Sequence, residues 1–377
     1  MLDILLTAAV SFIIAFLAIP VILQIAEQKK LFDIPDERKL HAQAVASLGG
    51  VGIFSGLLLS SLLAIDVSSN PEFQYFFAAA LVIFFLGLKD DIIVISATKK
   101  FIGQIVAASI IIHLGGIRID SMHGFLGVDQ LPLAVSYAIS YLTIILVINS
   151  FNLIDGVDGL AASLGIMTTL VFGSYFFMIG STAYALLAFS LCGSLVAFLI
   201  YNHHPAKIFM GDSGSLMIGL IASILVIRFI SVASDPFVRL PVSSSVAVGI
   251  SVLFLPLLDT LRVFAIRIFN GRSPFTPDRN HIHHLLLAWG LNHAAVTLVC
   301  VTINICFLAI TWSARSLGST PILLAMLCTS LIGIALLYYF RPRKGMVITR
   351  GLTGTTALKT PSKVVTLTHE PVKAENN

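Results

Sequence analysis

The feature that most constrains this chain is the recurrence of long apolar segments. Runs of about 17–25 residues recur along most of the 377-residue sequence, and each can cross the ~30 Å hydrocarbon core of a bilayer as a helix. Hydrophobic residues make up 57% of the chain and charged residues 11%, which excludes an ordinary soluble domain. The sequence therefore predicts an all-α, polytopic membrane protein.

We expect about eleven transmembrane helices in this chain. The first apolar run has no basic stretch before it and no small-residue cleavage pattern after it, so we interpret it as a membrane helix and not as a signal peptide. The expected spans are residues 3–25, 48–65, 74–89, 100–115, 132–150, 159–178, 182–201, 213–232, 244–266, 293–312 and 320–340.

Basic residues are distributed unequally between the two sets of loops. Of the 23 Lys and Arg residues, all but Arg118, Arg228, Arg239 and Arg315 lie in the tail or in regions that end or follow odd-numbered spans. Because basic loops stay in the cytoplasm, we expect the N-terminus outside and the C-terminus in the cytoplasm. We further expect a membrane-embedded domain at 1–344 and a flexible, polar cytoplasmic tail at 345–377.

Five polar clusters interrupt the apolar pattern, and each follows an odd-numbered span. All five therefore lie on the predicted cytoplasmic face. A transporter would place ionisable groups near mid-span, so this distribution favours a membrane enzyme with a water-soluble substrate in the cytoplasm. The clusters are residues 32–50, 88–100, 149–163, 201–215 and 270–286.

Three of these clusters supply oxygen ligands. Two neighbouring carboxylates at a helix end are either a solvated pair neutralised by nearby lysines or part of a metal or general-base site. A single helix-start aspartate can be a simple cap, but an asparagine and two aspartates among glycines exceed that need. Oxygen donors without a Cys/His set select Mg²⁺ or Mn²⁺. The residues are Asp90, Asp91, Asn152, Asp155, Asp158 and Asp212.

Two further clusters are cationic. His281, His283 and His284 follow Arg279, and such a set binds either zinc or phosphate and sugar groups; the oxygen-rich surroundings favour the second interpretation. The first loop adds Arg38, Lys39 and His41 as another edge for an anion, and Asp259 is expected to pair with Arg262 one helical turn on. These residues predict a Mg²⁺-dependent phosphoryl-transfer site with a second substrate held in the bilayer.

The motifs DDIIVIS, NLIDGVDGL, FMGDSGSL and SPFTPDRNHIHHLL together resemble the polyprenyl-phosphate N-acetylhexosamine-1-phosphate transferases. The resemblance covers residues 1 to about 340 in motif order, and PDRNHIHH is most similar to the bacterial undecaprenyl-phosphate GlcNAc-1-phosphate branch. The first loop departs from the family pattern, since Ala44, Ala46 and Ser47 stand where prolines and an arginine are common.

The resemblance implies a reaction. UDP-GlcNAc and undecaprenyl phosphate would give GlcNAc-diphospho-undecaprenol and UMP, as the first membrane step of a cell-envelope polysaccharide such as lipopolysaccharide O-antigen. Another UDP-N-acetylhexosamine, carrying GalNAc or MurNAc-pentapeptide, fits the same motifs, and a lipid or sugar-phosphate carrier is the rival class. The expected location is the bacterial plasma (inner) membrane, with the site facing the cytoplasm and no nucleic-acid partner.

The resemblance also implies residue roles. Asp212, with Asn152, would ligate Mg²⁺ or Mn²⁺, while Asp155 would line the cleft beside them. Catalytic Asp90 and Asp91 would lie at the lipid phosphate and would position it, remove a residual proton or form a covalent intermediate. Substrate binding would fall to Asp155, Asp158, Asn202, Phe209 (stacked on uracil), Arg279, His281, His283, His284, Lys39 and His41.

Overall fold

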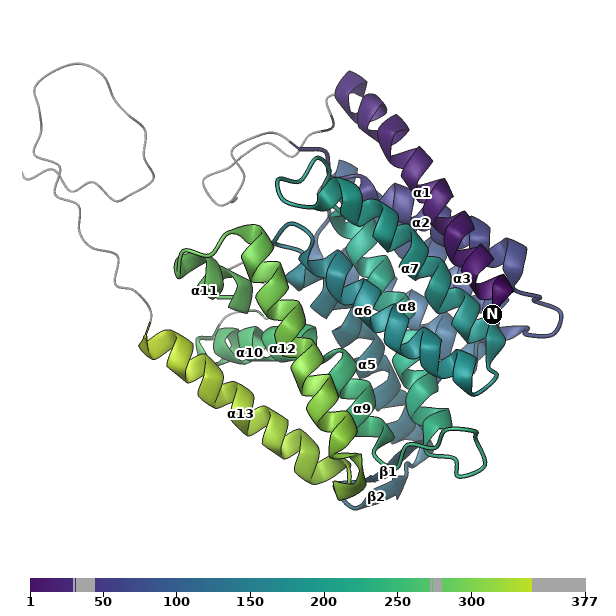
Figure 1. The fold of residues 1–377 in the computed structure, drawn as a ribbon, viewed down its shortest axis with the longest axis vertical. Coiled ribbons are helices and arrows are strands. Elements are labelled where there is room, and N and C mark those ends of the chain that lie inside the picture. The colour runs from purple at the N-terminus through teal and green to yellow at the C-terminus, as the bar shows by residue number, and fades with distance from the viewer. Residues whose placement is uncertain (30, 32–44, 272, 274–279, 341–377) are drawn as a thin grey trace, which may run out of the picture.

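The computed structural model describes residues 1–29, 31, 45–271, 273 and 280–340. Within these ranges the chain is almost entirely helical (Figure 1). Three predicted substrate-binding residues, Lys39, His41 and Arg279, lie outside the described residues, as does the tail 345–377.

The helices follow one another with short connections. In chain order the elements are α1 (Leu2–Lys29), α2 (Gly49–Ala64), α3 (Glu72–Ile92), α4 (Ala97–Ser109) continuing into the π-helical η1 (Ile110–Leu114), β1 (Ser121–Phe125), β2 (Val128–Gln130), α5 (Leu133–Ile154), α6 (Leu160–Met178), α7 (Thr182–Asn202), α8 (Gly211–Ala233), α9 (Ser245–Val252), α10 (Phe254–Phe269), α11 (Ile282–Ala288), α12 (His293–Ser313), the 3₁₀ turn η2 (Arg315–Leu317) and α13 (Ser319–Tyr339).

Eight helical segments among the described residues are long and apolar enough to cross a membrane, and the pair α9 and α10 would make a ninth. The prediction of a helical, polytopic membrane protein is confirmed at this level. The count of about eleven stays a prediction; α2, at 16 residues, is shorter than the roughly 20 residues that a span normally needs.

Helix α8 lies at the centre of the bundle. Of its apolar window 83% is buried inside the protein, against 17% for α13. Helices α2, α3 and α5 pack on α8, and glycines on α2 and α3 let these two helices approach its first turn. A Cβ on Gly87 of α3 would lie 2.5 Å from the Cα of Ser213, so only a glycine fits at this contact. The start of α8 is therefore the point where three other helices converge.

We expected one continuous helix over residues 244–266. The structure instead has two helices there, α9 and α10, with a bend of 80° between them. Pro256 has no N–H and cannot bond back to the carbonyl of Val252. The buried side chain of Asn304 on α12 compensates: its Nδ2 donates to the Val252 carbonyl at 3.0 Å and its Oδ1 accepts from the Leu255 N–H at 2.8 Å. Helix α10 then runs across the bundle and packs on α5 and α12 (Figure 1).

Apart from a small antiparallel hairpin, β1–β2, the described residues form no β-sheet, so the prediction of an all-α fold class is confirmed. The hairpin lies at the lower end of the molecule in Figure 1, below α9. Leu126 and Gly127 link the strands with φ of 54° and 75°. Positive φ at both residues is what a tight two-residue hairpin turn requires. The polar segment that forms it carries no long alternating pattern, so the sequence did not indicate strands.

Candidate active site

The end of α3 caps the start of α8. Both carboxylate oxygens of Asp91 accept hydrogen bonds there: Oδ1 from the N–H of Asp212 at 2.6 Å, and Oδ2 from the N–H and the hydroxyl of Ser213 at 3.1 and 2.6 Å. The first N–H groups of a helix have no partner within the helix, and a carboxylate there also suits the helix dipole. Asp91 therefore fixes the position of the residue that follows Gly211.

Gly211 is required at this junction for two reasons. Its φ is +72°, in the left-handed region that side chains disfavour. A Cβ here would also lie 2.7 Å from both carboxylate oxygens of Asp91 and 2.3 Å from the carbonyl oxygen of Ser47. The glycine thus lets the cap approach the backbone of α8 directly.

Asp212 contacts Asn152, the other predicted metal-binding residue. Its Oδ1 accepts from the Nδ2 of Asn152, at the end of α5, at 2.9 Å. Its Oδ2 forms an ion pair with Lys100 of α4, and Lys100 also pairs with Oδ2 of Asp90 at 2.6 Å. In the sequence, Lys100 is only one of several lysines that could neutralise nearby carboxylates. In the structure it lies between the carboxylates of Asp90 and Asp212.

Asp155 lies in the loop between α5 and α6, next to this group. Burial raises its pKa well above the usual value, and the nearby carboxylates of Asp212, Asp91 and Asp158 raise the pKa further. Among the residues that the structure describes, the charged groups that shift the pKa of Asp155 are carboxylates. A cluster of carboxylate and amide oxygens with excess negative charge has the donor chemistry that suits a hard divalent cation.

A cavity of about 180 Å³ opens beside Asn152. Its two charged lining residues are both cations, Lys100 and Arg267, and Arg267 comes from the buried face of α10. The bend between α9 and α10 is what brings this arginine to the cavity. The other lining residues are amides and apolar groups: Gln104, Asn149, Asn152, Ile95, Ala97, Phe101, Leu153 and Phe264.

Asp158, at the far end of the same loop, lies between two histidines. Its Oδ2 lies 2.7 Å from Nδ1 of His204, and its Oδ1 lies 3.3 Å from Nδ1 of His293. The ligand atoms of the three residues all lie within 4.8 Å of one another, so nitrogen-preferring metals also fit this set. Sequence reasoning missed both histidines: His204 lies inside a polar cluster, but His293 begins an apolar helix and carries no such signal.

Asn202, at the end of α7, contacts the residue next to Asp158, and Phe209 lies in the loop before α8. Asn202 accepts the N–H of Gly159 at 2.8 Å and donates to the carbonyl of Ile208 at 2.8 Å. The backbone N–H of Phe209 donates to the carbonyl of Ala46 at 2.8 Å, while its ring remains partly exposed. Asn202 therefore ties the loop after α5 to the loop before α8.

The histidine cluster at the start of α11 is anchored by Asp259. Oδ2 of Asp259 lies 2.7 Å from Nδ1 of His281, and Oδ1 accepts from Arg262 at 3.0 Å, so the expected pairing of Asp259 and Arg262 is confirmed. Burial, with the neighbouring His284, lowers the pKa of His283 to about 3. A Cβ on Gly156 would lie 2.6 Å from Nε2 of His283, which places this cluster against the aspartate loop.

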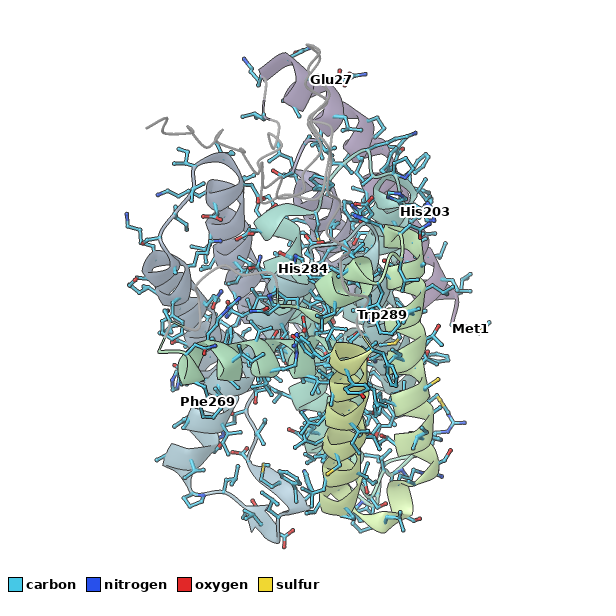
Figure 2. The ribbon with its side chains drawn as sticks, turned by 90° about the vertical axis from the view of Figure 1, so that its left-hand side faces the viewer. Met1, Glu27, His203, Phe269, His284 and Trp289 are labelled. Atoms are coloured by element: carbon cyan, nitrogen blue, oxygen red, sulfur yellow. The ribbon has the colours of Figure 1, made fainter. Side chains whose placement is uncertain are left out.

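The structure thus brings the predicted residues into two linked groups. Figure 2 shows His203 at the end of α7 and His284 on α11 in the same half of the molecule as Glu27. The roles assigned to these residues stay predictions. The first group is Asp90, Asp91, Asn152, Asp155 and Asp212; the second is Asp158, Asn202, Phe209, His281, His283 and His284.

Comparison with known proteins adds an independent finding. Residues 73–230 match the sequence model described as Glycosyl transferase family 4. The chain is 32% identical to the "Probable undecaprenyl-phosphate N-acetylglucosaminyl 1-phosphate transferase" of Bacillus subtilis, over 79% of this chain and 82% of the relative. It is 34% identical to the decaprenyl-phosphate N-acetylglucosaminephosphotransferase of Mycobacterium tuberculosis, over 78% and 77%. It is also 26% identical to the undecaprenyl-phosphate alpha-N-acetylglucosaminyl 1-phosphate transferase of Escherichia coli, over 76% and 77%.

Proposed function

We propose one specific reaction for this chain, which belongs to glycosyl transferase family 4 and is an enzyme that transfers a sugar 1-phosphate. In that reaction GlcNAc-1-phosphate passes from UDP-GlcNAc to undecaprenyl phosphate, and the products are GlcNAc-diphospho-undecaprenol and UMP. The names of the relatives support the sugar and the lipid class.

One observation carries the proposal: an acidic cluster and a cationic cavity share Lys100 and Asn152. Transfer between a nucleotide diphosphate and a lipid phosphate brings several phosphate charges to one place. A divalent cation on the acidic side and two protein cations on the other side would balance them. A site built for uncharged substrates would have no need of this pairing.

The acidic side would hold Mg²⁺ or Mn²⁺. Asp212, with Asn152, supplies the oxygen donors, and Asp91 keeps Asp212 in place through the helix cap. The bound metal would neutralise the diphosphate and stabilise charge that develops at phosphorus. Asp90 orients Lys100, since it pairs with the ammonium at 2.6 Å and accepts the N–H of Ile95 at 2.7 Å.

The lipid phosphate would attack directly. The second pKa of a phosphate monoester is about 6, so the group is already largely ionised at neutral pH. One of its oxygens would form a bond to the sugar-bearing phosphorus, in line with the oxygen that bridges to the other phosphorus. That bridging bond would break and its electron pair would leave with UMP. Lys100 and Arg267 would bind the phosphate oxygens as this occurs.

The nucleotide would lie toward the second group of residues. Asp158 and Asn202 would contact the uridine, Phe209 would stack on uracil, and the cluster from His281 to His284 would contact the sugar or phosphates. Asn202 joins the two loops that carry these residues, which supports one shared binding region.

We also propose the finer topology. The membrane domain would span residues 1–344 with eleven helices, α2 and α3 among them, an external N-terminus and a cytoplasmic tail at 345–377. The protein would lie in the plasma membrane of a bacterium, and its active site would face the cytoplasm. The excess of Lys and Arg on one set of loops supports this orientation.

An assay of the purified protein tests the proposal. Full-length protein, undecaprenyl phosphate and a panel of UDP-sugars should release UMP, with UDP-GlcNAc as the preferred donor. Preference for UDP-GalNAc or UDP-MurNAc-pentapeptide would reassign the sugar. Transport of substrate into vesicles without UMP release would replace the transferase with a carrier.

A further inference from the structure

The buried carboxylate of Asp158 lies between two imidazole rings. The side chain of Asp158 is 2% exposed. Its Oδ2 lies 2.7 Å from Nδ1 of His204 and also accepts the N–H of Ala206 at 3.3 Å. Its Oδ1 lies 3.3 Å from Nδ1 of His293. Nδ1 of His293 also accepts the backbone N–H of Asp158 at 3.4 Å, so this imidazole contacts both the carboxylate and the backbone of the residue.

These contacts join three parts of the chain that are far apart in sequence. Asp158 follows α5, His204 lies between α7 and α8, and His293 begins α12. The two imidazole rings stack with centroids 5.0 Å apart and an interplanar angle of 29°. Thr297, one turn beyond His293, donates its hydroxyl to the backbone carbonyl of Asp158 at 2.9 Å. Helix α12 thus holds both the side chain and the backbone of this aspartate.

The position of His204 argues against a purely structural role. Its side chain is 38% exposed, so it lies at the surface of the site and not in the core. Its loop continues through Ile208 to Phe209, and Asn202 at the other side of that loop holds Gly159, the neighbour of Asp158. The two histidines therefore contact the end of the Asp155–Gly159 loop. This end faces the loop that runs from Asn202 to Phe209.

From this geometry we infer that His204 and His293 are positioning residues, which fix the Asp158 carboxylate for recognition of the uridine nucleotide. The inference rests on the proposed function in placing the nucleotide at Asp158. Metal ligation and phosphoryl transfer are assigned to Asp212 and its neighbours. Loss of a histidine therefore weakens nucleotide binding and leaves the chemical step largely intact.

The main test compares three single variants of the full-length protein in lipid nanodiscs. His204→Ala removes the donor, whereas His204→Asn keeps an amide nitrogen near the place of Nδ1. His203→Ala is the matched control, because His203 is the exposed neighbour on the same loop. We expect His204→Ala to raise the KM for UDP-GlcNAc by about 10- to 100-fold, as loss of a hydrogen bond to a charged group does. The kcat should change little, His204→Asn should recover most of the loss, and His203→Ala should match the wild type.

A second measurement does not depend on turnover. Calorimetric titration with UMP should show the same order of affinity: wild type, His203→Ala and His204→Asn bind more tightly than His204→Ala and His293→Ala. In an Asp158→Asn background, His204→Ala should add little further loss, because the histidine acts through that carboxylate. Full additivity of the two losses would overturn the inference, and so would equal KM values for His204→Ala and His203→Ala.

The outcomes separate this inference from the proposed function. A wild-type protein that neither binds UMP nor turns over any UDP-sugar overturns both. Normal wild-type activity with an unchanged His204→Ala variant overturns the positioning role alone. A titration with Zn²⁺ completes the test, since the same three donors fit such a metal. Tight Zn²⁺ binding that is lost with His204 or His293, without any effect on nucleotide affinity, would assign the cluster to a metal instead.

Discussion

Oδ1 of Asp91 accepts the backbone N–H of Asp212 at 2.6 Å, across 121 positions in the sequence. One of two adjacent carboxylates on α3 thus caps the helix that carries the proposed metal ligand. Its neighbour Asp90 faces Lys100 instead. The two residues look equivalent in the sequence, but their hydrogen bonds give them different tasks, and several predictions depend on that difference.

Replacement of Asp91 should affect stability as well as rate. Asp91→Ala removes the acceptor for two N–H groups and one hydroxyl, so we expect a loss of about 1–2 kcal/mol in stability together with activity. Ser213→Ala removes only the hydroxyl contact and should be milder. Thermal unfolding in detergent measures the first effect and UMP release the second. An Asp91→Ala protein as stable as the wild type would contradict the capping role.

Asp90→Asn should keep the fold but slow the reaction. If Asp90 acts as an obligatory base, the rate should fall by about 10²–10⁴-fold and the loss should shrink above the phosphate pKa of about 6. If it only orients Lys100, the loss should be similar at every pH. A covalent route predicts UMP exchange into UDP-GlcNAc without lipid. Rate profiles from pH 5 to 9 and the exchange assay distinguish the three mechanisms.

Activity should require Mg²⁺ or Mn²⁺, and Asp212→Asn should abolish it. The neutral amide keeps the size of the side chain but loses the charge that the metal needs. Removal of metal with EDTA should stop UMP release, and added Mg²⁺ should restore it. Full turnover in excess EDTA would exclude the assigned metal role.

Lys100→Met should lower kcat by about 10²–10³-fold, because it removes a positioned cation from a phosphate site and leaves Asp90 and Asp212 without their shared partner. Lys99→Met is the matched control, since Lys99 is the exposed neighbour on the same helix. Lys100→Arg should recover only part of the rate, because a planar guanidinium does not reproduce a point charge. Similar rates for the Lys99 and Lys100 variants would remove Lys100 from the site.

Asn304→Leu should destabilise the bend between α9 and α10. The apolar side chain leaves the N–H of Leu255 and the carbonyl of Val252 without partners, at a cost of about 1–3 kcal/mol. Because α10 carries Arg267, activity should fall as well. Thr302→Val, on the same helix, serves as the control. Unfolding temperatures and UMP release measure both effects; an unchanged Asn304→Leu variant would show that the bend is held otherwise.

Single cysteines test the proposed orientation. In a background without the four native cysteines, Ser273→Cys should be labelled only from the cytoplasmic side and Ser121→Cys only from outside. Labelling of both positions by an impermeant reagent on intact cells would overturn the topology.

The membrane class and most residues of the candidate site could be selected from the sequence for a simple reason. A helix that crosses a bilayer must be a long apolar segment, so such segments can be recognised directly in the sequence, and any polar residue among them is conspicuous. That contrast was sufficient to select Asp90, Asp91, Asn152, Asp155, Asp158 and Asp212, and the same contrast excluded an ordinary soluble fold.

Only the tertiary structure separated the tasks of these residues. Whether a carboxylate caps α8 or lies between two histidines depends on contacts between residues more than 40 positions apart, and apolar periodicity carries no such information. The same reason hid the bend at Pro256, where the compensating amide of Asn304 comes from another helix. It also hid His293, whose partner Asp158 is 135 positions away. The sequence by itself determined which residues are polar in an apolar chain; packing around α8 decided which of them meet.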